Sequence, residues 1–299
     1  MNITISGASG FIGRRLVKAL LEEKHALRVL SRNGGTNLPP GVKLSVWHPL
    51  RGEPPADALE NAHAVIHLSG EPVAQRWTDE TKGIIRDSRV HGTRHLVQAL
   101  STLSRRPSVL VCASAIGIYG SRGDQVLTET SSPGSGFLPD VCVAWEKQAD
   151  LAESLGIRVA KIRIGIVLDP QGGALKKMLP PFQAFVGGKL GSGRQWMSWI
   201  HLDDLVGLMR YVIGRPVRGP VNGTAPNPVT NKEFTRTLAG TLKRPALFPA
   251  PAFALKLALG EMSEILLASQ RVLPKVAQED GFRFQYPQLQ PALEQLLRP

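Results

Sequence analysis

The chain has 299 residues, 42% of them apolar and 20% charged, a composition that predicts a globular, enzyme-sized protein with one large core and a smaller lobe. Disordered, collagen-like and coiled-coil chains are excluded. With 36 basic and 24 acidic residues the net charge is +12, which favours an anionic partner: nucleic acid, a membrane or a phosphorylated small molecule.

Short β-branched segments alternate with helical patterns through the first half of the chain, as is typical of βαβ units around a parallel sheet. An amphipathic helix is expected at residues 11–24, where Leu16, Val17 and Leu20 share one face. Strands are expected at residues 2–6, 26–31, 43–47, 64–69, 108–113 and 158–168.

The connecting and terminal segments show less regular patterns. Glycine and proline predict loops at residues 33–40, 49–55 and 130–136. The last part of the chain predicts a helix over 265–273, a strand-like segment over 282–286 and a helix over 289–297.

The composition changes after residue 170: glycine and basic residues become frequent, and proline interrupts the following segments. We therefore predict an α/β fold with two parts. They are a Rossmann-type doubly wound parallel sheet in residues 1–170, completed by 196–225, and a smaller C-terminal α/β substrate lobe in residues 171–195 and 226–299.

Only two cysteines occur, Cys112 and Cys142, which are too few for a disulfide framework and do not form a CxxC pair. The start of the chain lacks a signal-peptide pattern, and no uncharged apolar segment reaches 18 residues. We expect a cytoplasmic protein without a metal site and without a membrane as partner.

The strongest local motif is the GxxGxxG sequence of residues 7–13, placed between the first expected strand and helix. Glycines there let backbone N–H groups and the helix N-terminus approach a pyrophosphate, whereas a turn needed only for tight packing is the alternative. Because a strand precedes it and an amphipathic helix follows, we expect a dinucleotide site. Its expected contacts are Gly7, Ser9, Gly10, Phe11, Ile12 and Gly13.

The end of the second strand indicates which dinucleotide binds. An NAD site carries Asp or Glu there for the ribose 2′-OH. This chain has Ser31 and Arg32, a hydroxyl and a guanidinium that suit a 2′-phosphate. We therefore predict NADP(H) as cofactor; an ordinary exposed Arg is the alternative.

These residues resemble the extended short-chain dehydrogenase/reductases, the superfamily of the sugar-nucleotide epimerases. Residues 7–13 match its nucleotide motif, IHLSG at 66–70 its fourth-strand segment, and IHLDDL at 200–205 its downstream IHxxD element. A narrower likeness to the YfcH-type "epimerase family" proteins, an atypical branch, is carried by LSGEP at 68–72, MLPPF at 178–182 and SQRVLP at 269–274.

The resemblance implies that Leu68, Ser69 and Gly70 lie along the cofactor, and we also expect Arg89 and Val167 to contact it. Extended members use a Tyr-x-x-x-Lys pair on one helix face, in which Lys lowers the pKa of the Tyr that exchanges a proton with the substrate. Here Cys142 stands at the Tyr position and Glu146 at the Lys position, and that proton relay is absent.

Three side chains are candidates to replace the missing pair. Glu71 follows the fourth strand near the expected nicotinamide, Ser114 ends the fifth strand, and Tyr119 lies just beyond it. The alternatives are a hydrogen-bonded core hydroxyl for Ser114 and a packed aromatic with a satisfied OH for Tyr119. Cys142 is either a nucleophile or, without a base partner, an inert apolar residue.

The second part of the chain is the expected substrate side. It holds 16 basic against 8 acidic residues, and Lys189 and Arg194 lie in a glycine-rich segment suited to an anion. A flexible basic hairpin without a ligand is the alternative. Trp77 and Trp196 are either cleft walls or core residues.

Two functions remain open. The first is an NADP-dependent oxidoreductase or nucleotide-sugar-type epimerase acting on a small anionic substrate through a non-standard acid or base. The second is a catalytically silent NADP(H)-sensing or regulatory protein, because the Tyr and Lys are absent. The resemblance to plant and cyanobacterial relatives linked to control of cell division keeps an interaction role open. We expect no nucleic-acid partner, since the basic residues are dispersed. The oligomeric state is not predicted.

Overall fold

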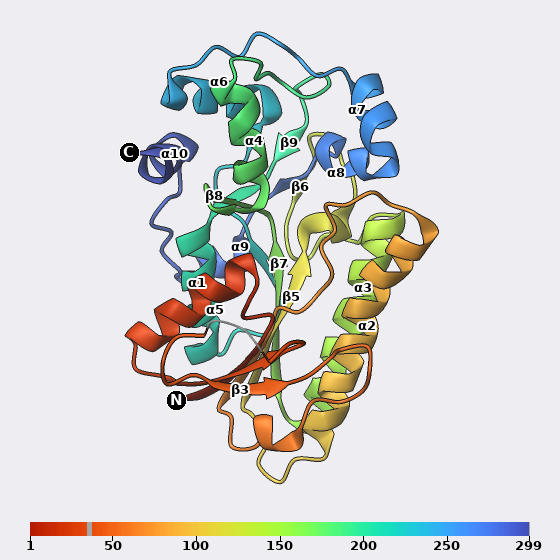
Figure 1. The fold of residues 1–299 in the computed structure, drawn as a ribbon, viewed down its shortest axis with the longest axis vertical. Coiled ribbons are helices and arrows are strands. Elements are labelled where there is room, and N and C mark those ends of the chain that lie inside the picture. The colour runs from red at the N-terminus through yellow and green to blue at the C-terminus, as the bar shows by residue number, and fades with distance from the viewer. Residues whose placement is uncertain (35–37, 299) are drawn as a thin grey trace.

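A seven-stranded parallel sheet forms the centre of the computed structural model, which describes residues 1–34 and 38–298 (Figure 1). Its strand order is β3-β2-β1-β4-β5-β7-β11, so the chain changes direction across the sheet between β1 and β4. Such a switch point is where open α/β sheets bind ligands. The strands are β1 Asn2–Ser6, β2 Ala26–Ser31, β3 Lys43–Val46, β4 Ala64–His67, β5 Val109–Ala115, β7 Arg158–Ile164 and β11 Gly219–Gly223.

Helices cover both faces of the sheet (Figure 1), which confirms the predicted doubly wound α/β class. On one face, α1 (Phe11–Glu22) and α5 (Leu202–Gly214) pack into a core with β1. On the other, α2 (Asp79–Ser101) and α3 (Phe137–Asp150) pack against β4 and β5. The apolar stripe of α1 faces the sheet as its spacing predicts.

The strand predicted over residues 158–168 was wrong as a single strand. β7 ends at Ile164, and β8 (Ile166–Asp169) leaves the sheet to pair with β10 (Trp199–His201). Gly165 stands at the break, where a Cβ atom would lie 2.5 Å from the Ser198 carbonyl oxygen. A glycine there lets the chain pass close to its neighbour and change sheets.

The C-terminal part packs around a separate apolar cluster that includes Trp199, Phe234 and Leu293. The helix predicted over 289–297 is confirmed as α10 (Leu289–Leu297). The remaining helices and strands are β6 Val126–Leu127, α4 Gly173–Gln183, β9 Trp196–Met197, β12 Val229–Thr230, α6 Asn231–Leu242, α7 Ala252–Leu259, α8 Glu264–Leu267, β13 Arg271–Val272 and α9 Lys275–Glu279. Short 3₁₀ turns are η1 Ala56–Ala58, η2 Ile116–Tyr119, η3 Leu151–Leu155 and η4 Gly260–Ser263.

Two predictions in this part were wrong. The helix expected over 265–273 ends at Leu267 with α8, and β13 follows it to pair with β6. Residues 282–286 form no strand. Their alternating aromatic pattern has another cause, because Phe282 and Phe284 pack against the first core. The next two backbone N–H groups donate to the Asp204 carboxylate, at 2.7 and 2.9 Å, instead of to a sheet partner.

The predicted loops at 49–55 and 130–136 contain no strand or α-helix, as expected. The loop predicted at 33–40 includes residues 35–37, which lie outside the described residues. Within the part of the chain that the structure describes, no helix has both the length and the apolar character needed to cross a bilayer.

Candidate cofactor site and a buried polar network

The turn between β1 and α1 is built by close backbone approach. Gly7 has a φ of +76°, and a Cβ atom on it would lie 2.7 Å from the Leu68 carbonyl carbon after β4. A Cβ atom on Gly13 would overlap the Gly7 carbonyl oxygen. Gly10 precedes α1 without a side-chain cap, so the first N–H groups of the helix have no acceptor within it. The arrangement leaves a helix N-terminus open to an anion.

A buried histidine ties the strands beneath this turn. His67, at the end of β4, has its Nδ1 2.6 Å from Ser6 Oγ at the end of β1 and its Nε2 3.1 Å from Thr93 Oγ1 on α2. Burial lowers the pKa of His67 to about 4, so the ring is neutral at pH 7. These contacts hold the two strands on either side of the switch point.

Arg32 and Glu71 lie together at the carboxyl ends of β2 and β4. Arg32 Nη1 is 3.5 Å from Glu71 Oε2, and the Arg32 side chain is 62% exposed. The Glu71 backbone N–H donates to Ser88 Oγ at 3.0 Å. Ser31, just before Arg32, is half-buried at the strand end. Sequence reasoning expected Glu71 beside the nicotinamide, whereas the structure brings it to the predicted 2′-phosphate residue.

Arg89 reaches from α2 to the segment after β4. Its guanidinium lies against Gly70 and over the Trp145 ring, with Cζ 5.2 Å from the ring centroid, and its Nη1 donates to the Ile85 carbonyl at 3.0 Å. Burial lowers the pKa of Arg89. Among the described residues it has no carboxylate within ion-pair distance. A cation without an ion-pair partner therefore stands behind the Leu68–Gly70 segment.

Other predicted cofactor contacts gather at the start of α1. The Phe11 ring lies against the backbone of residues 172–173, and Val167 packs in the same cluster as Phe11. Ser9 is exposed in the turn, and Ile12 is half-buried on the first turn of the helix. The structure thus groups Ser9, Phe11, Ile12 and Val167 around one helix N-terminus.

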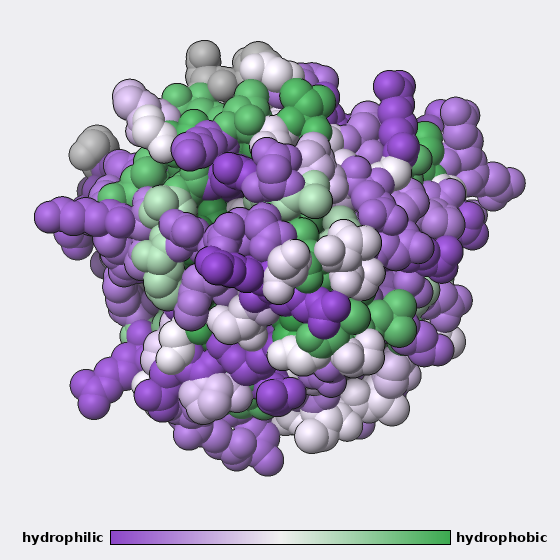
Figure 2. All heavy atoms as spheres, turned by 90° about the horizontal axis from the view of Figure 1, so that it is seen from below, coloured by the Kyte–Doolittle hydropathy of each residue, from purple (hydrophilic) through white to green (hydrophobic). Residues whose placement is uncertain are grey.

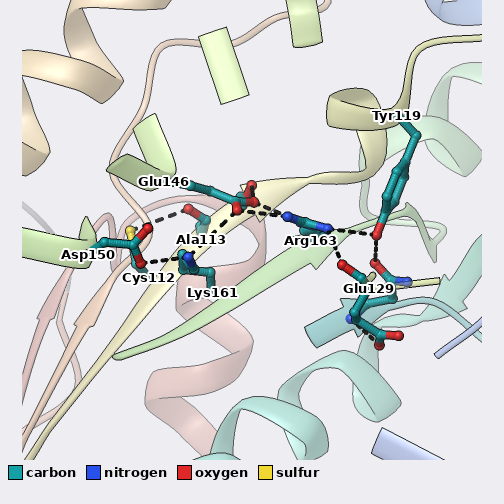
Figure 3. A network of polar contacts seen from close by, with 10 residues as sticks. Cys112, Ala113, Tyr119, Glu129, Glu146, Asp150, Lys161 and Arg163 are labelled. Atoms are coloured by element: carbon teal, nitrogen blue, oxygen red, sulfur yellow. Dashed lines mark hydrogen bonds and ion pairs between the residues drawn. The ribbon is translucent and has the colours of Figure 1, made fainter. Parts of the chain in front are cut away.

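A buried polar network is centred on Glu146 of α3 (Figure 3). Glu146 is 6% exposed and accepts from Arg163 through both oxygens, at 2.8 Å from Nε and 2.9 Å from Nη2. Ser114 Oγ donates to Glu146 Oε1 at 2.6 Å. On the other side, Lys161 Nζ lies 2.6 Å from Asp150 Oδ1 and 3.9 Å from Glu146 Oε2. Glu146 therefore anchors a buried ion pair between α3 and β7.

Tyr119 belongs to the same network (Figure 3). Its OH donates to Asn222 Oδ1 at 2.7 Å and accepts from Arg163 Nη1 at 2.9 Å, and the side chain is fully buried. Burial raises the pKa of Tyr119. Arg163 Nη1 also donates to the Glu129 carbonyl at 3.1 Å. The Tyr119 phenol thus links Arg163 of β7 to Asn222 of β11, and Arg163 extends the link to the loop of Glu129.

Burial also makes both cysteines unreactive. It raises the pKa of Cys142 to about 12, with the charge of Glu146 adding to the effect. It raises the pKa of Cys112 further. Both thiols are therefore protonated at neutral pH, which supports the interpretation of Cys142 as an inert apolar residue.

Sequence reasoning missed Arg163 and Asn222, which complete the network. Arg163 and Lys161 alternate with apolar residues in β7, and charged residues in a strand of a central parallel sheet are the signal that would have found Arg163. Asn222 lies in β11, 103 residues from its partner Tyr119, and no local pattern connects the two.

The substrate-side residues are more dispersed. Trp77 packs edge-on against Phe137 with ring centroids 5.0 Å apart. The Trp196 ring lies 4.3 Å below the guanidinium of Arg271, and its Nε1 donates to Asp124 at 2.8 Å. Arg271, which sequence reasoning did not single out, is thus the cation stacked on this indole. Lys189 Nζ reaches only the Ser192 carbonyl, at 3.5 Å.

Figure 2 shows the face of the molecule at the amino-terminal ends of the strands, opposite the candidate cofactor site. Hydrophilic residues cover most of it, with apolar residues in smaller groups. An open hollow of about 460 Å³ occurs at the amino-terminal ends of the strands. It is lined by Met1, Asn2, Asn61, Ala62, His63, Arg105, Arg106 and Ser108. None of the predicted site residues lines it.

Residues 3–225 match the model of the NAD dependent epimerase/dehydratase family. The chain belongs to this family. A second match, to a domain of unknown function called DUF1731, covers residues 250–296 and thus α7 to α10. The predicted family resemblance is confirmed over the length of the chain.

Relatives agree with this placement. The chain is 42% identical to the Arabidopsis thaliana "Epimerase family protein SDR39U1 homolog, chloroplastic", over 100% of this chain and 87% of that protein. It is 38% identical to the Bacillus subtilis epimerase family protein YfhF, over 99% and 98%. Among solved structures, human epimerase family protein SDR39U1 with NADPH superposes with a TM-score of 0.88 at 30% identity, covering 99% of each chain.

Proposed function

We propose that this epimerase-family protein binds NADP(H) at the β1–α1 turn, with Arg32 on the 2′-phosphate. The observation that carries the proposal is Arg32 at the carboxyl end of β2, next to an open helix N-terminus. An NAD site would carry a carboxylate at the end of β2. The NADPH in the human SDR39U1 structure supports the same choice.

Within that site, Glu71 positions Arg32 and does not act at the nicotinamide. Its carboxylate oxygen lies 3.5 Å from Arg32 and thus at the 2′-phosphate end of the site. Arg89 is the second cation toward the cofactor, because it lies behind residues 68–70 without an ion-pair partner among the described residues. Phe11 and Val167 line the other side of the helix N-terminus.

The activity that the geometry supports best is NADP(H) sensing without proton transfer by the protein. Ser114, Glu146 and Tyr119 are 2%, 6% and 0% exposed, and each is hydrogen-bonded within one network. A general acid or base must reach the proton that it moves. Using any of the three in this way requires breaking contacts to the buried Arg163 ion pair.

The second candidate is an NADP-dependent oxidoreductase or epimerase acting on a small anionic substrate. One observation favours it: Arg271 stacks on Trp196, and an indole with a cation is suited to a partly apolar anion. Under this candidate the proton comes from water or from the substrate itself, since the Tyr and Lys positions hold Cys142 and Glu146.

Arg32→Ala tests the cofactor assignment. We expect NADPH affinity to fall by about 100-fold, because a bidentate Arg–phosphate contact is lost, with NADH affinity unchanged. Titration of each cofactor by isothermal calorimetry measures this. Arg105→Ala, on the opposite face, is the matched control and should bind as the unaltered protein does. Equal affinities of the unaltered protein for NADPH and NADH would overturn the assignment.

A turnover experiment separates the two candidates. The protein with NADPH is mixed with small carbonyl compounds, and the protein with NADP+ is mixed with nucleotide sugars. Absorbance at the reduced-nicotinamide band is followed over one turnover, and the sugars are separated by chromatography to detect epimers, because an epimerase returns its hydride and consumes no cofactor. Sensing predicts no consumption above buffer, and Tyr119→Phe should behave identically. Substrate-dependent change in NADPH, or formation of an epimer, would contradict sensing and establish the enzyme. If Tyr119→Phe abolished it with NADPH binding intact, Tyr119 would supply the proton in place of water or the substrate.

A further inference from the structure

Helix α7 presents its apolar residues to solvent. None of its eight residues is buried, and Phe253 and Leu257 are 74% and 88% exposed. They stand four positions apart and so on one side of the helix. Figure 1 shows α7 at the outer edge of the molecule, above α3. In a folded chain large apolar side chains are rarely exposed together to this extent.

The exposed apolar area continues beyond the helix. Phe248 donates its backbone N–H to the Gly187 carbonyl at 3.2 Å, so the segment before α7 runs beside the segment after α4. The large apolar side chains of both segments are 49–73% exposed. We define the α7 apolar surface as Phe185, Val186, Leu247, Phe248, Phe253 and Leu257.

The two segments that carry this surface contain basic residues and no acidic ones. Residues 170–194 and 234–260 contain no Asp or Glu. Lys243, Arg244 and Lys256 are exposed within the second segment, and the Arg244 guanidinium lies 4.4 Å from the centroid of the Phe185 ring. The next acidic residue, Glu261, forms an ion pair with Lys82 of α2. The apolar side chains therefore have only cations beside them in these two segments.

We propose that the α7 apolar surface docks the protein on the interface of an anionic lipid bilayer. Exposed Phe and Leu enter the boundary between head groups and acyl chains, and flanking Lys and Arg pair with anionic head groups. The combination of apolar side chains that are 49–88% exposed with basic residues in the same two segments is complementary to such a surface. Spanning segments, which are absent from the described helices, are not needed for it. The proposal is independent of NADP(H) binding.

Co-sedimentation with vesicles tests the proposal. We expect the full chain to bind phosphatidylglycerol/phosphatidylcholine vesicles about tenfold or more tightly than pure phosphatidylcholine, with binding weakened by added salt. Phe253→Ser/Leu257→Ser should lose about tenfold or more of the binding to the anionic vesicles. Val46→Ser/Leu151→Ser, which changes two other exposed apolar residues, is the matched control and should bind normally. Far-ultraviolet circular dichroism and Tm verify that every variant is folded.

Three results would overturn the proposal. The first is failure of the unaltered protein to bind anionic vesicles. The second is equal loss of binding in the α7 and control variants. The third is concentration-dependent self-association without lipid that Phe253→Ser/Leu257→Ser abolishes, measured by light scattering after size exclusion, because it would assign the surface to a second copy of the chain.

Discussion

Two regions at the carboxyl edge of the same sheet differ in how their charged groups are used. Around β1, β2 and β4, Arg32 is 62% exposed, and Arg89 has no ion-pair partner among the described residues. Around β5 and β7, Glu146 and Arg163 are 6% and 7% exposed and satisfy each other. In the first, open region Arg32 has only a 3.5 Å contact to Glu71, and Arg89 has no paired carboxylate among the described residues. In the second, closed region the charged groups pair with each other in the core.

The largest expected effect is a loss of stability when the buried network around Glu146 is disrupted. Glu146→Ala leaves the Arg163 guanidinium buried without its carboxylate, and Lys161 loses a nearby anion. Removing one partner of a buried ion pair costs about 3–5 kcal/mol. Urea denaturation at pH 7 should show a loss of this size in the free energy of unfolding.

A double variant supplies the control. Glu146→Leu/Arg163→Met removes both charges and should destabilise the protein less than Glu146→Ala does, because no buried charge is left unpaired. If Glu146→Ala lowered the free energy of unfolding by less than about 1 kcal/mol, the network would not stabilise the fold. The two regions would then not differ in how their charged groups are used.

A smaller effect is the pH dependence of stability that the buried His67, beneath the β1–α1 turn, should cause. The pKa of His67 is lowered to about 4 in the folded chain, against an ordinary 6.5. Above pH 6.5 the ring is neutral in both states. Between pH 6.5 and 4 only the unfolded chain takes the proton, so stability falls by up to about 3 kcal/mol as the pH is lowered through this window.

Urea denaturation of the unaltered protein and of His67→Gln from pH 7 to 4 measures this effect. The amide can still contact Ser6 and Thr93, so we expect a folded variant with a shallower decline in stability. Identical pH profiles would show that His67 titrates normally and does not hold the β1–β4 junction as a neutral group.

Sequence reasoning was most successful where structure is local. The glycine turn, the apolar stripe of α1 and the strand end at Ser31 each depend on neighbours within a few residues, so spacing predicts them. The position of Glu71 was not predictable in this way. It depends on how the segment after β4 lies relative to β2, which is two places away in the sheet.

The closed network was hidden for the same reason. Nothing near Glu146 or Tyr119 in the sequence indicates that Arg163 and Asn222 arrive from β7 and β11. Gly165 illustrates a further limit. It lies in a continuous β-branched segment that reads as one strand, and only the approach of the Ser198 carbonyl shows why the chain must change sheets there.

The order of strands has a consequence for how the protein is synthesised. β11, the edge strand beside β7, comes from residues 219–223. Ala277 of α9 lies later still in the chain but packs in the same core as β1. A chain emerging from the ribosome can therefore complete its first core only after most of its length has been made. β7 keeps a row of unpaired backbone groups from the synthesis of residue 164 until residues 219–223 have followed, and the hazard of pairing with another chain is concentrated in that interval.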